Sequence, residues 1–173
     1  MKQNVSIFWF RRDLRLEDNI GLNHALESNS NVLPIFIFDK EILSQLPKND
    51  ARVTFIHNTV QDLSEQLKQN YNSSIAMYYG NPIDVFNSLT DKYFIDAVYT
   101  NHDYEPYALQ RDAALKKLLS HKKIAFYTYK DHVVFEKDEI VKSDGNPYVV
   151  YTPYKNRWKE KFNPEIHLRT EDN

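Results

Sequence analysis

Residues 5–19 read Val-Ser-Ile-Phe-Trp-Phe-Arg-Arg-Asp-Leu-Arg-Leu-Glu-Asp-Asn, an apolar run that passes abruptly into a loop rich in arginine and acid. The apolar run is nearly continuous rather than alternating, which is typical of a strand buried on both faces of a parallel sheet. Arginine makes planar, bidentate contacts with carboxylates. We therefore predict a structural ion-pair loop made of Arg11, Arg12, Asp13, Arg15 and Asp18.

Four more apolar runs follow along the chain, and helical patterns lie between them. The clearest helix runs from about Asp50 to Tyr71, where apolar residues recur at intervals of three and four. Another begins with Asn81 as its N-cap and Pro82 at its first helical position. The other expected strands cover residues 32–38, 74–79, 97–100 and 124–129, and the other expected helices cover 19–27 and 107–121. This alternation predicts an α/β fold, a Rossmann-like doubly wound five-stranded parallel sheet with helices on both faces.

The pattern changes after Lys130, and this change sets the expected domain organisation. Residues 1–135 are predicted to form the α/β domain. Residues 136–162 are predicted to close the same domain with a loop around the turn at 144–147 and a short helix. Residues 163–173 have no apolar periodicity and are expected to begin an interdomain linker or a disordered tail.

Composition excludes several classes of site. The 173 residues hold no cysteine, which rules out disulfides and thiolate metal sites. Only Gly21, Gly80 and Gly145 are present, far apart, whereas dinucleotide loops, P-loops and nucleophile elbows need neighbouring glycines. The six histidines are scattered, so no metal site is expected. Because no signal sequence or membrane span is evident, we expect a cytoplasmic protein with no membrane partner.

A ligand site is expected where the strands end, because ligands of doubly wound sheets bind beyond the carboxyl ends of the strands. Polar and aromatic residues gather at those ends, but each has a structural alternative. Asp39 and Arg52 would also fit a plain salt bridge or a helix cap. The acids near Asp103 would also fit a helix start. The lysines and aromatics at 154–162 would also fit a solvated amphipathic helix. No nucleophile, base and orienting group emerge as a set, so catalytic residues are not predicted.

Several segments resemble the DNA photolyase/cryptochrome family in order and spacing. They are the opening loop, Phe38-Asp39, Asp50-Ala51-Arg52-Val53, residues 99–107 with Arg111-Asp112, and residues 145–158. The resemblance implies the N-terminal antenna domain of a deoxyribodipyrimidine photolyase. Such a domain harvests light and passes excitation to FAD in a C-terminal helical domain, which repairs cyclobutane pyrimidine dimers in DNA. The full-length protein would be a light-dependent carbon–carbon lyase, whereas this chain alone is not expected to be catalytic.

The resemblance also implies a chromophore site. Carried over position by position, its cofactor-binding residues are Phe36, Phe38, Asp39, Arg52, Val53 and Asp103. This set favours an antenna chromophore of the deazaflavin or FMN type. A folate is disfavoured, because Tyr107 and Ala108 stand where its Asn-Glu pair would be.

Two alternatives stay open from the sequence. One is the same domain of a cryptochrome blue-light photoreceptor, and the other is a free-standing flavin- or nucleotide-binding module. The expected partner is the C-terminal FAD-binding domain, with damaged DNA reached through that domain and not directly. Without it, an exposed apolar interface would favour self-association of this chain.

Overall fold

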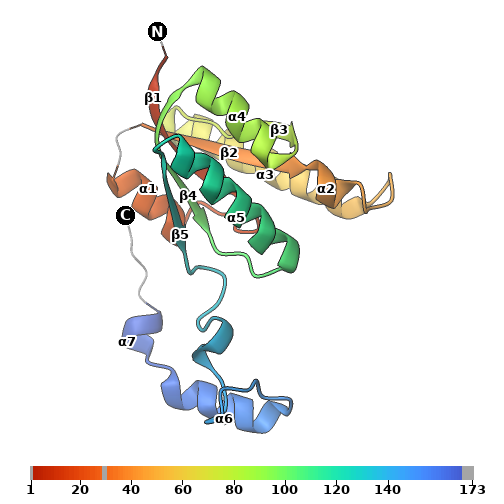
Figure 1. The fold of residues 1–173 in the computed structure, drawn as a ribbon, viewed down its shortest axis with the longest axis vertical. Coiled ribbons are helices and arrows are strands. Elements are labelled where there is room, and N and C mark those ends of the chain that lie inside the picture. The colour runs from red at the N-terminus through yellow and green to blue at the C-terminus, as the bar shows by residue number, and fades with distance from the viewer. Residues whose placement is uncertain (1, 29–30, 169–173) are drawn as a thin grey trace.

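The computed structural model describes residues 2–28 and 31–168, which fold around a five-stranded, all-parallel sheet (Figure 1). The strand order is β3-β2-β1-β4-β5, so the direction of winding reverses between β1 and β4. The strands are β1 (Asn4–Phe10), β2 (Val32–Asp39), β3 (Ala76–Gly80), β4 (Phe94–Asn101) and β5 (Ala125–Tyr129). The predicted Rossmann-like α/β fold is confirmed.

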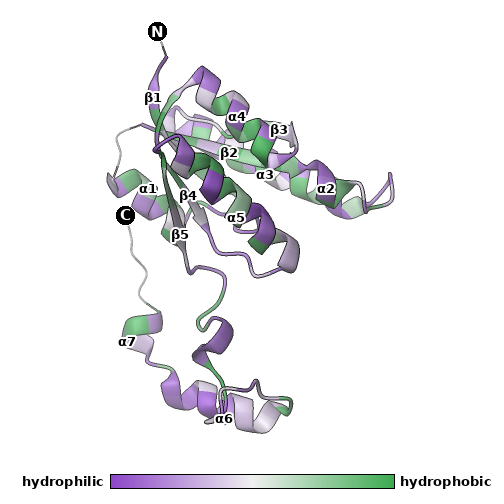
Figure 2. Cartoon of the chain, viewed as in Figure 1, coloured by the Kyte–Doolittle hydropathy of each residue, from purple (hydrophilic) through white to green (hydrophobic). Residues whose placement is uncertain are grey.

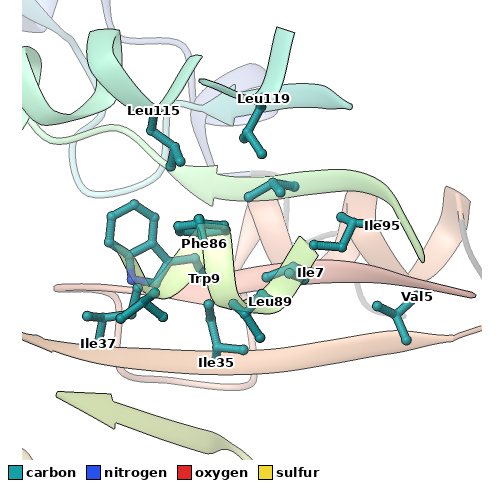
Figure 3. Close-up of a cluster of buried hydrophobic side chains, with 12 residues drawn as sticks. Val5, Ile7, Trp9, Ile35, Ile37, Phe86, Leu89, Ile95, Leu115 and Leu119 are labelled. Atoms are coloured by element: carbon teal, nitrogen blue, oxygen red, sulfur yellow. The ribbon is translucent and has the colours of Figure 1, made fainter. Parts of the chain in front are cut away.

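Helices cover both faces of the sheet. The first face packs against α1 (Ile20–Ser28) and α3 (Ala51–Tyr71), and the second packs against α4 (Pro82–Lys92) and α5 (Pro106–His121). Because side chains alternate along a strand, β1 supplies both layers. Phe8 and Phe10 enter the first layer, whereas Ile7 and Trp9 enter the second. Figure 3 shows the second layer, in which Trp9 meets Phe86 edge to face with ring centroids 5.4 Å apart.

Helix starts follow the capping signals in the sequence. The side chains of Asp50 and Asn81 accept hydrogen bonds from the backbone N–H groups of Arg52 and Ile83, which places them as the N-caps of α3 and α4. Asp39 likewise caps α2 (Lys40–Leu43), a helix that sequence periodicity missed because four residues cannot show a repeat. Side chains therefore cap α2, α3 and α4, whereas Glu105 at the start of α5 makes no capping hydrogen bond with its side chain.

Residues 133–168, here called the arm, extend away from the sheet (Figure 1). The arm contains the 3-10 turn η1 (Lys137–Glu139), α6 (Tyr151–Lys161) and α7 (Pro164–His167), and an antiparallel bridge joins Val141 to Pro147 across the predicted turn. Its α6 is largely hydrophilic (Figure 2), and the rings of Phe135, Trp158, Phe162 and His167 contact one another. The division at 135/136 and the linker at 163–173 stay predictions, and residues 169–173 lie outside the described part.

The start of α1 packs unusually closely on the end of β4. The backbone N–H of Gly21 donates to Asn101 Oδ1 over 2.9 Å. A Cβ atom at position 21 would lie 2.6 Å from that oxygen and 3.0 Å from the Phe8 ring. Glycine is therefore required here by a close approach between two elements.

We expect Gly21→Ala to lower the free energy of unfolding by about 1–3 kcal/mol, because the added methyl group overpacks a rigid site. Urea denaturation measures the change. In an Asn101→Ala background the same substitution should cost less, since the clashing oxygen is gone. Equal costs in the two backgrounds would contradict this explanation.

Candidate functional site

The loop after β1 is held by a buried carboxylate. Asp13, only 3% exposed, accepts hydrogen bonds from the Arg11 backbone N–H (2.8 Å) and from Asn101 Nδ2 (2.5 Å). Asn101 also donates to Asn19 Oδ1 over 2.9 Å. The buried amide of Asn101 thus joins the end of β4 to the β1 loop and to the residue before α1.

The three arginines of this loop reach acids that lie far away in the sequence. Arg11 Nη1 contacts both carboxylate oxygens of Asp112 on α5, at 2.7 and 2.8 Å. Arg15 pairs bidentately with Asp131, which follows β5, at 2.8 and 2.9 Å. Arg12 donates to Glu105 over 2.8 Å. Asp18 lies 3.9 Å from Arg15, so most partners of the predicted ion-pair loop come from outside it.

Two guanidinium groups lie against one indole. Arg11 and Arg111 lie 5.0 and 4.9 Å from the centroid of the Trp9 ring, and their side chains are 5% and 6% exposed. Burial lowers the pKa of Arg11 from its usual value, and the adjacent Asp112 opposes that shift. Neither Arg11 Nε nor Arg111 Nη2 has a hydrogen-bond partner among the described residues. Contact with the indole face offsets part of that cost.

A cavity of about 360 Å³ opens beside these arginines, over the carboxyl ends of β1 and β2. That volume is within the usual range for small-molecule sites. Its wall contains all six residues that the sequence assigned to a chromophore, namely Phe36, Phe38, Asp39, Arg52, Val53 and Asp103. Three separate segments, namely β2, the start of α3 and the loop after β4, bring these residues together at one edge of the sheet. Their role in binding stays a prediction.

Other residues of the wall were not predicted. The apolar side of the cavity is extended by Ile42, Leu46 and Ile56, and its inner end by Trp9 and Arg111. The α2 residue Ile42 belongs to the helix that periodicity missed. Arg111 belongs to the Arg111-Asp112 segment that resembles the family. Its local sequence, however, does not indicate that its side chain lies near the end of β2.

Asp39 is a structural hub as well as part of the wall. Its carboxylate accepts from the Glu41 backbone N–H over 3.0 Å and from the Tyr107 hydroxyl over 2.7 Å. Burial raises the pKa of Tyr107 well above its usual value, and the hydrogen bond to Asp39 adds to that shift. Arg111 Nη1 lies 3.9 Å away from Asp39. Asp39 does not pair with Arg52; instead it ties β2 to α5.

Arg52 makes a local ion pair. Its Nε and Nη2 donate to the two oxygens of Asp50 over 2.9 and 2.6 Å, and its side chain is 71% exposed. The bond to Arg52 lowers the pKa of Asp50 to about 2. Arg52 is therefore a solvated cation on the cavity wall, held in place by the N-cap of its own helix.

A carboxylate pair closes the cavity near Arg12. Asp103 and Glu105 both line the cavity, and Arg12 lies 3.7 Å from the first and 2.8 Å from the second. The Asp103 side chain is largely buried, whereas Arg12 and Glu105 reach the surface. The wall therefore combines apolar rings with a fixed set of charges.

The described residues include one group with metal-ligand character. Asp13, Asp131 and His132 each place one ligand atom within 4.8 Å of the others, a proximity that sequence spacing did not indicate. Asp13 and Asp131 already accept hydrogen bonds from Asn101 and Arg15. We assign no metal to this group. None of the helices in the described ranges is both long and apolar enough to cross a membrane.

A family model described as DNA photolyase matches residues 6–171. The deoxyribodipyrimidine photo-lyase of a Synechococcus strain is 33% identical over 91% of this chain and 32% of its own length. A crystal structure of a class III photolyase from Agrobacterium tumefaciens superposes with a TM-score of 0.80 at 29% identity, over 94% of this chain and 33% of that one.

An archaeal photolyase structure from Sulfolobus tokodaii, described as containing two FAD molecules and implying a novel light-harvesting cofactor, is 32% identical with a TM-score of 0.69. It matches 81% of this chain and 32% of that one. Cryptochromes are also among the curated relatives, including one from Gallus gallus at 30% identity over 82% of this chain and 24% of its length.

These photolyases are about three times as long as the match, and the chain corresponds to their N-terminal portion. The family match and the fold agree with each other. The chain belongs to the DNA photolyase family.

Proposed function

We propose that this chain is the antenna domain of a cytoplasmic deoxyribodipyrimidine photolyase and that the cavity at the ends of β1 and β2 holds a chromophore of the flavin or deazaflavin type. The observation that carries this proposal is the convergence of Phe36, Phe38, Asp39, Arg52, Val53 and Asp103 on one cavity. When bound, the chromophore absorbs light and passes its excitation to FAD. The FAD would belong to a helical partner domain, which would also bind the damaged DNA.

The chemistry of the wall fits a flat, partly apolar ring. Phe36, Phe38 and Val53 offer apolar surface, which is how small-molecule sites usually hold a ring system. Arg12 and Arg52 are exposed cations at the same cavity and would attract an anionic tail. Arg111 adds a buried positive charge at the inner end.

A folate at the start of α5 has less support. Tyr107 already donates its hydroxyl to Asp39, and Ala108 is 2% exposed and carries no polar atom. Neither side chain provides the carboxylate or amide that would recognise a pterin. A cryptochrome role for the same domain is the second candidate, favoured by the cryptochromes among its relatives.

The test is a fluorescence titration of this chain with FMN, a deazaflavin and a reduced folate. Saturable one-to-one binding of FMN or the deazaflavin, without comparable folate binding, is the expected result. Binding of none of the three, by a chain shown to be folded by circular dichroism, would overturn the proposal. Assay of light-dependent dimer repair with this chain joined to its own FAD domain would separate photolyase from cryptochrome.

Arg52→Ala should weaken FMN binding by about 1.5–3 kcal/mol, the range for hydrogen bonds to charged groups, because its guanidinium, although paired with Asp50, is exposed at the cavity and would meet the phosphate. Riboflavin, which lacks the phosphate, is the matched control ligand and should bind both proteins equally. By NMR, the pKa of Asp50 should rise in the variant from about 2 toward 3.8. Equal losses for FMN and riboflavin would instead indicate a structural role.

A further inference from the structure

The loop between β4 and α5 has two sets of side chains that contact different parts of the molecule. His102 and Tyr104 contact Glu136 in the arm. Asp103 and Glu105, which alternate with them, line the cavity and contact Arg12. Four consecutive residues thus form a short bridge between the arm on one side and the cavity wall on the other.

Glu136 is the centre of the arm-side contacts. Its Oε1 lies 2.7 Å from His102 Nδ1 and also accepts a hydrogen bond from the Tyr104 hydroxyl. The Glu136 side chain is only 15% exposed. Hydrogen bonds of this kind to a partly desolvated carboxylate are stronger than those between neutral groups. One arm residue therefore holds two of the four loop residues.

The same turn fixes the rest of the arm. Glu136 and Glu139 form a reciprocal capping box around η1. The backbone oxygen of Glu139 accepts from Lys161 of α6 over 2.6 Å, and its carboxylate pairs with Lys130 at 2.9 Å. The turn that carries Glu136 is therefore held by its own capping box and by Lys130 as well as by α6.

On the cavity side, the loop has little freedom to move independently. It is tied at one end, where the His102 backbone N–H donates to the Tyr129 oxygen over 2.7 Å. At the other end Glu105 is the N-cap of α5 and is followed by Pro106, whose φ is restricted. A displacement of His102 and Tyr104 would thus also displace Asp103 and Glu105.

We propose that Glu136 is a positioning residue that holds the Asp103–Glu105 wall of the cavity in place, so that arm attachment and ligand binding at the cavity are coupled. As far as it concerns a chromophore, this inference rests on the proposed function. Coupling between two binding events is reciprocal. If the attached arm raises the affinity of the cavity for its ligand by some factor, the bound ligand must raise the equilibrium constant for arm attachment by the same factor.

The first experiment compares the wild-type chain with Glu136→Ala and Glu136→Gln. Glu136→Ala should weaken FMN binding about fivefold or more, at the lower end of typical coupling. Glu136→Gln keeps an acceptor for Tyr104 and should restore most of the affinity. FMN should slow protease cleavage of the arm in the wild-type chain but not in Glu136→Ala. Unchanged FMN affinity in Glu136→Ala would overturn the proposal. So would a rate of arm cleavage in the wild-type chain that does not change when FMN is added.

Lys161→Ala is the matched control for arm loosening. It removes the contact between α6 and Glu139 without touching the β4–α5 loop. It should speed cleavage within α6 only, because the Glu136 contacts and the η1 capping box remain, and FMN affinity should stay within about twofold of wild type, below the range of typical coupling. A fivefold loss in this control would mean that any damage to the arm weakens the cavity, which contradicts a specific role for Glu136.

A ligand-free readout separates this inference from the proposed function. Backbone amide NMR signals of Arg12, Asp103 and Glu105 should shift in Glu136→Ala, while signals near Phe55 on the far surface of α3 should not. If no flavin binds the wild-type chain, the proposed function fails. The NMR shifts alone then test whether Glu136 positions the Asp103–Glu105 wall. Unshifted signals at Arg12, Asp103 and Glu105 overturn it in either case.

Discussion

Asp112→Ala will lower the free energy of unfolding by about 3–5 kcal/mol, the typical cost of removing one partner from a buried ion pair. Asp112 contacts Arg11 at 2.7 and 2.8 Å and Arg111 Nε at 3.2 Å. Both arginine side chains are about as buried as core residues. Removal of the carboxylate leaves two desolvated cations beside each other without their shared counter-charge.

Urea denaturation of the variant measures this cost. The control is Glu160→Ala, which removes the partner of Arg157 from an exposed pair with the same 2.7 Å separation. Exposed pairs contribute about 0–1 kcal/mol, so that variant should stay close to wild type. A cost below about 1 kcal/mol for Asp112→Ala would show that water or rearrangement compensates the arginines, contrary to the buried-pair explanation.

Val53→Trp will reduce flavin affinity at least about 100-fold, which corresponds to about 2.7 kcal/mol. Val53 lines the cavity from the first turn of α3, so an indole at this position occupies space that a chromophore ring requires. The effect on folding should be small, because the new ring enters an open cavity rather than a packed core.

Phe55→Trp is the matched control for that substitution. Phe55 lies two positions further along α3, is 71% exposed and is absent from the cavity wall. A fluorescence titration should show wild-type affinity for this control, and thermal unfolding should show that both variants remain folded. Tight flavin binding by Val53→Trp would place the chromophore elsewhere on the domain.

The strands and long helices were predictable because residues that are buried in regular structure recur in the sequence as apolar runs or at regular intervals. The run at 5–10 indicated a strand, and the structure assigns β1 to Asn4–Phe10. The expected strand at 74–79 begins later, at Ala76, because Ile75 is buried without joining the ladder. Helix α2 has only four residues and depends on the Asp39 cap, so no repeat was available to reveal it.

The gathering of six residues at one cavity followed from the family resemblance and not from periodicity. Their individual partners could not be read from the sequence in the same way. Asp39 receives its hydrogen bond from Tyr107, 68 positions away, whereas Arg52 pairs only two positions away with Asp50. Side chains with several possible partners are assigned by the packed structure, since the competing contacts differ little in energy.

The cavity's carboxylates are already engaged by the protein itself. Asp39 bonds to Tyr107 and to the start of α2, and Asp103 and Glu105 share Arg12. A ligand is therefore not needed to neutralise or cap them, in contrast to sites whose metal drives folding. If the proposed chromophore binds in this cavity, it would enter a site whose charged walls are already formed, so it would exchange without unfolding of the domain.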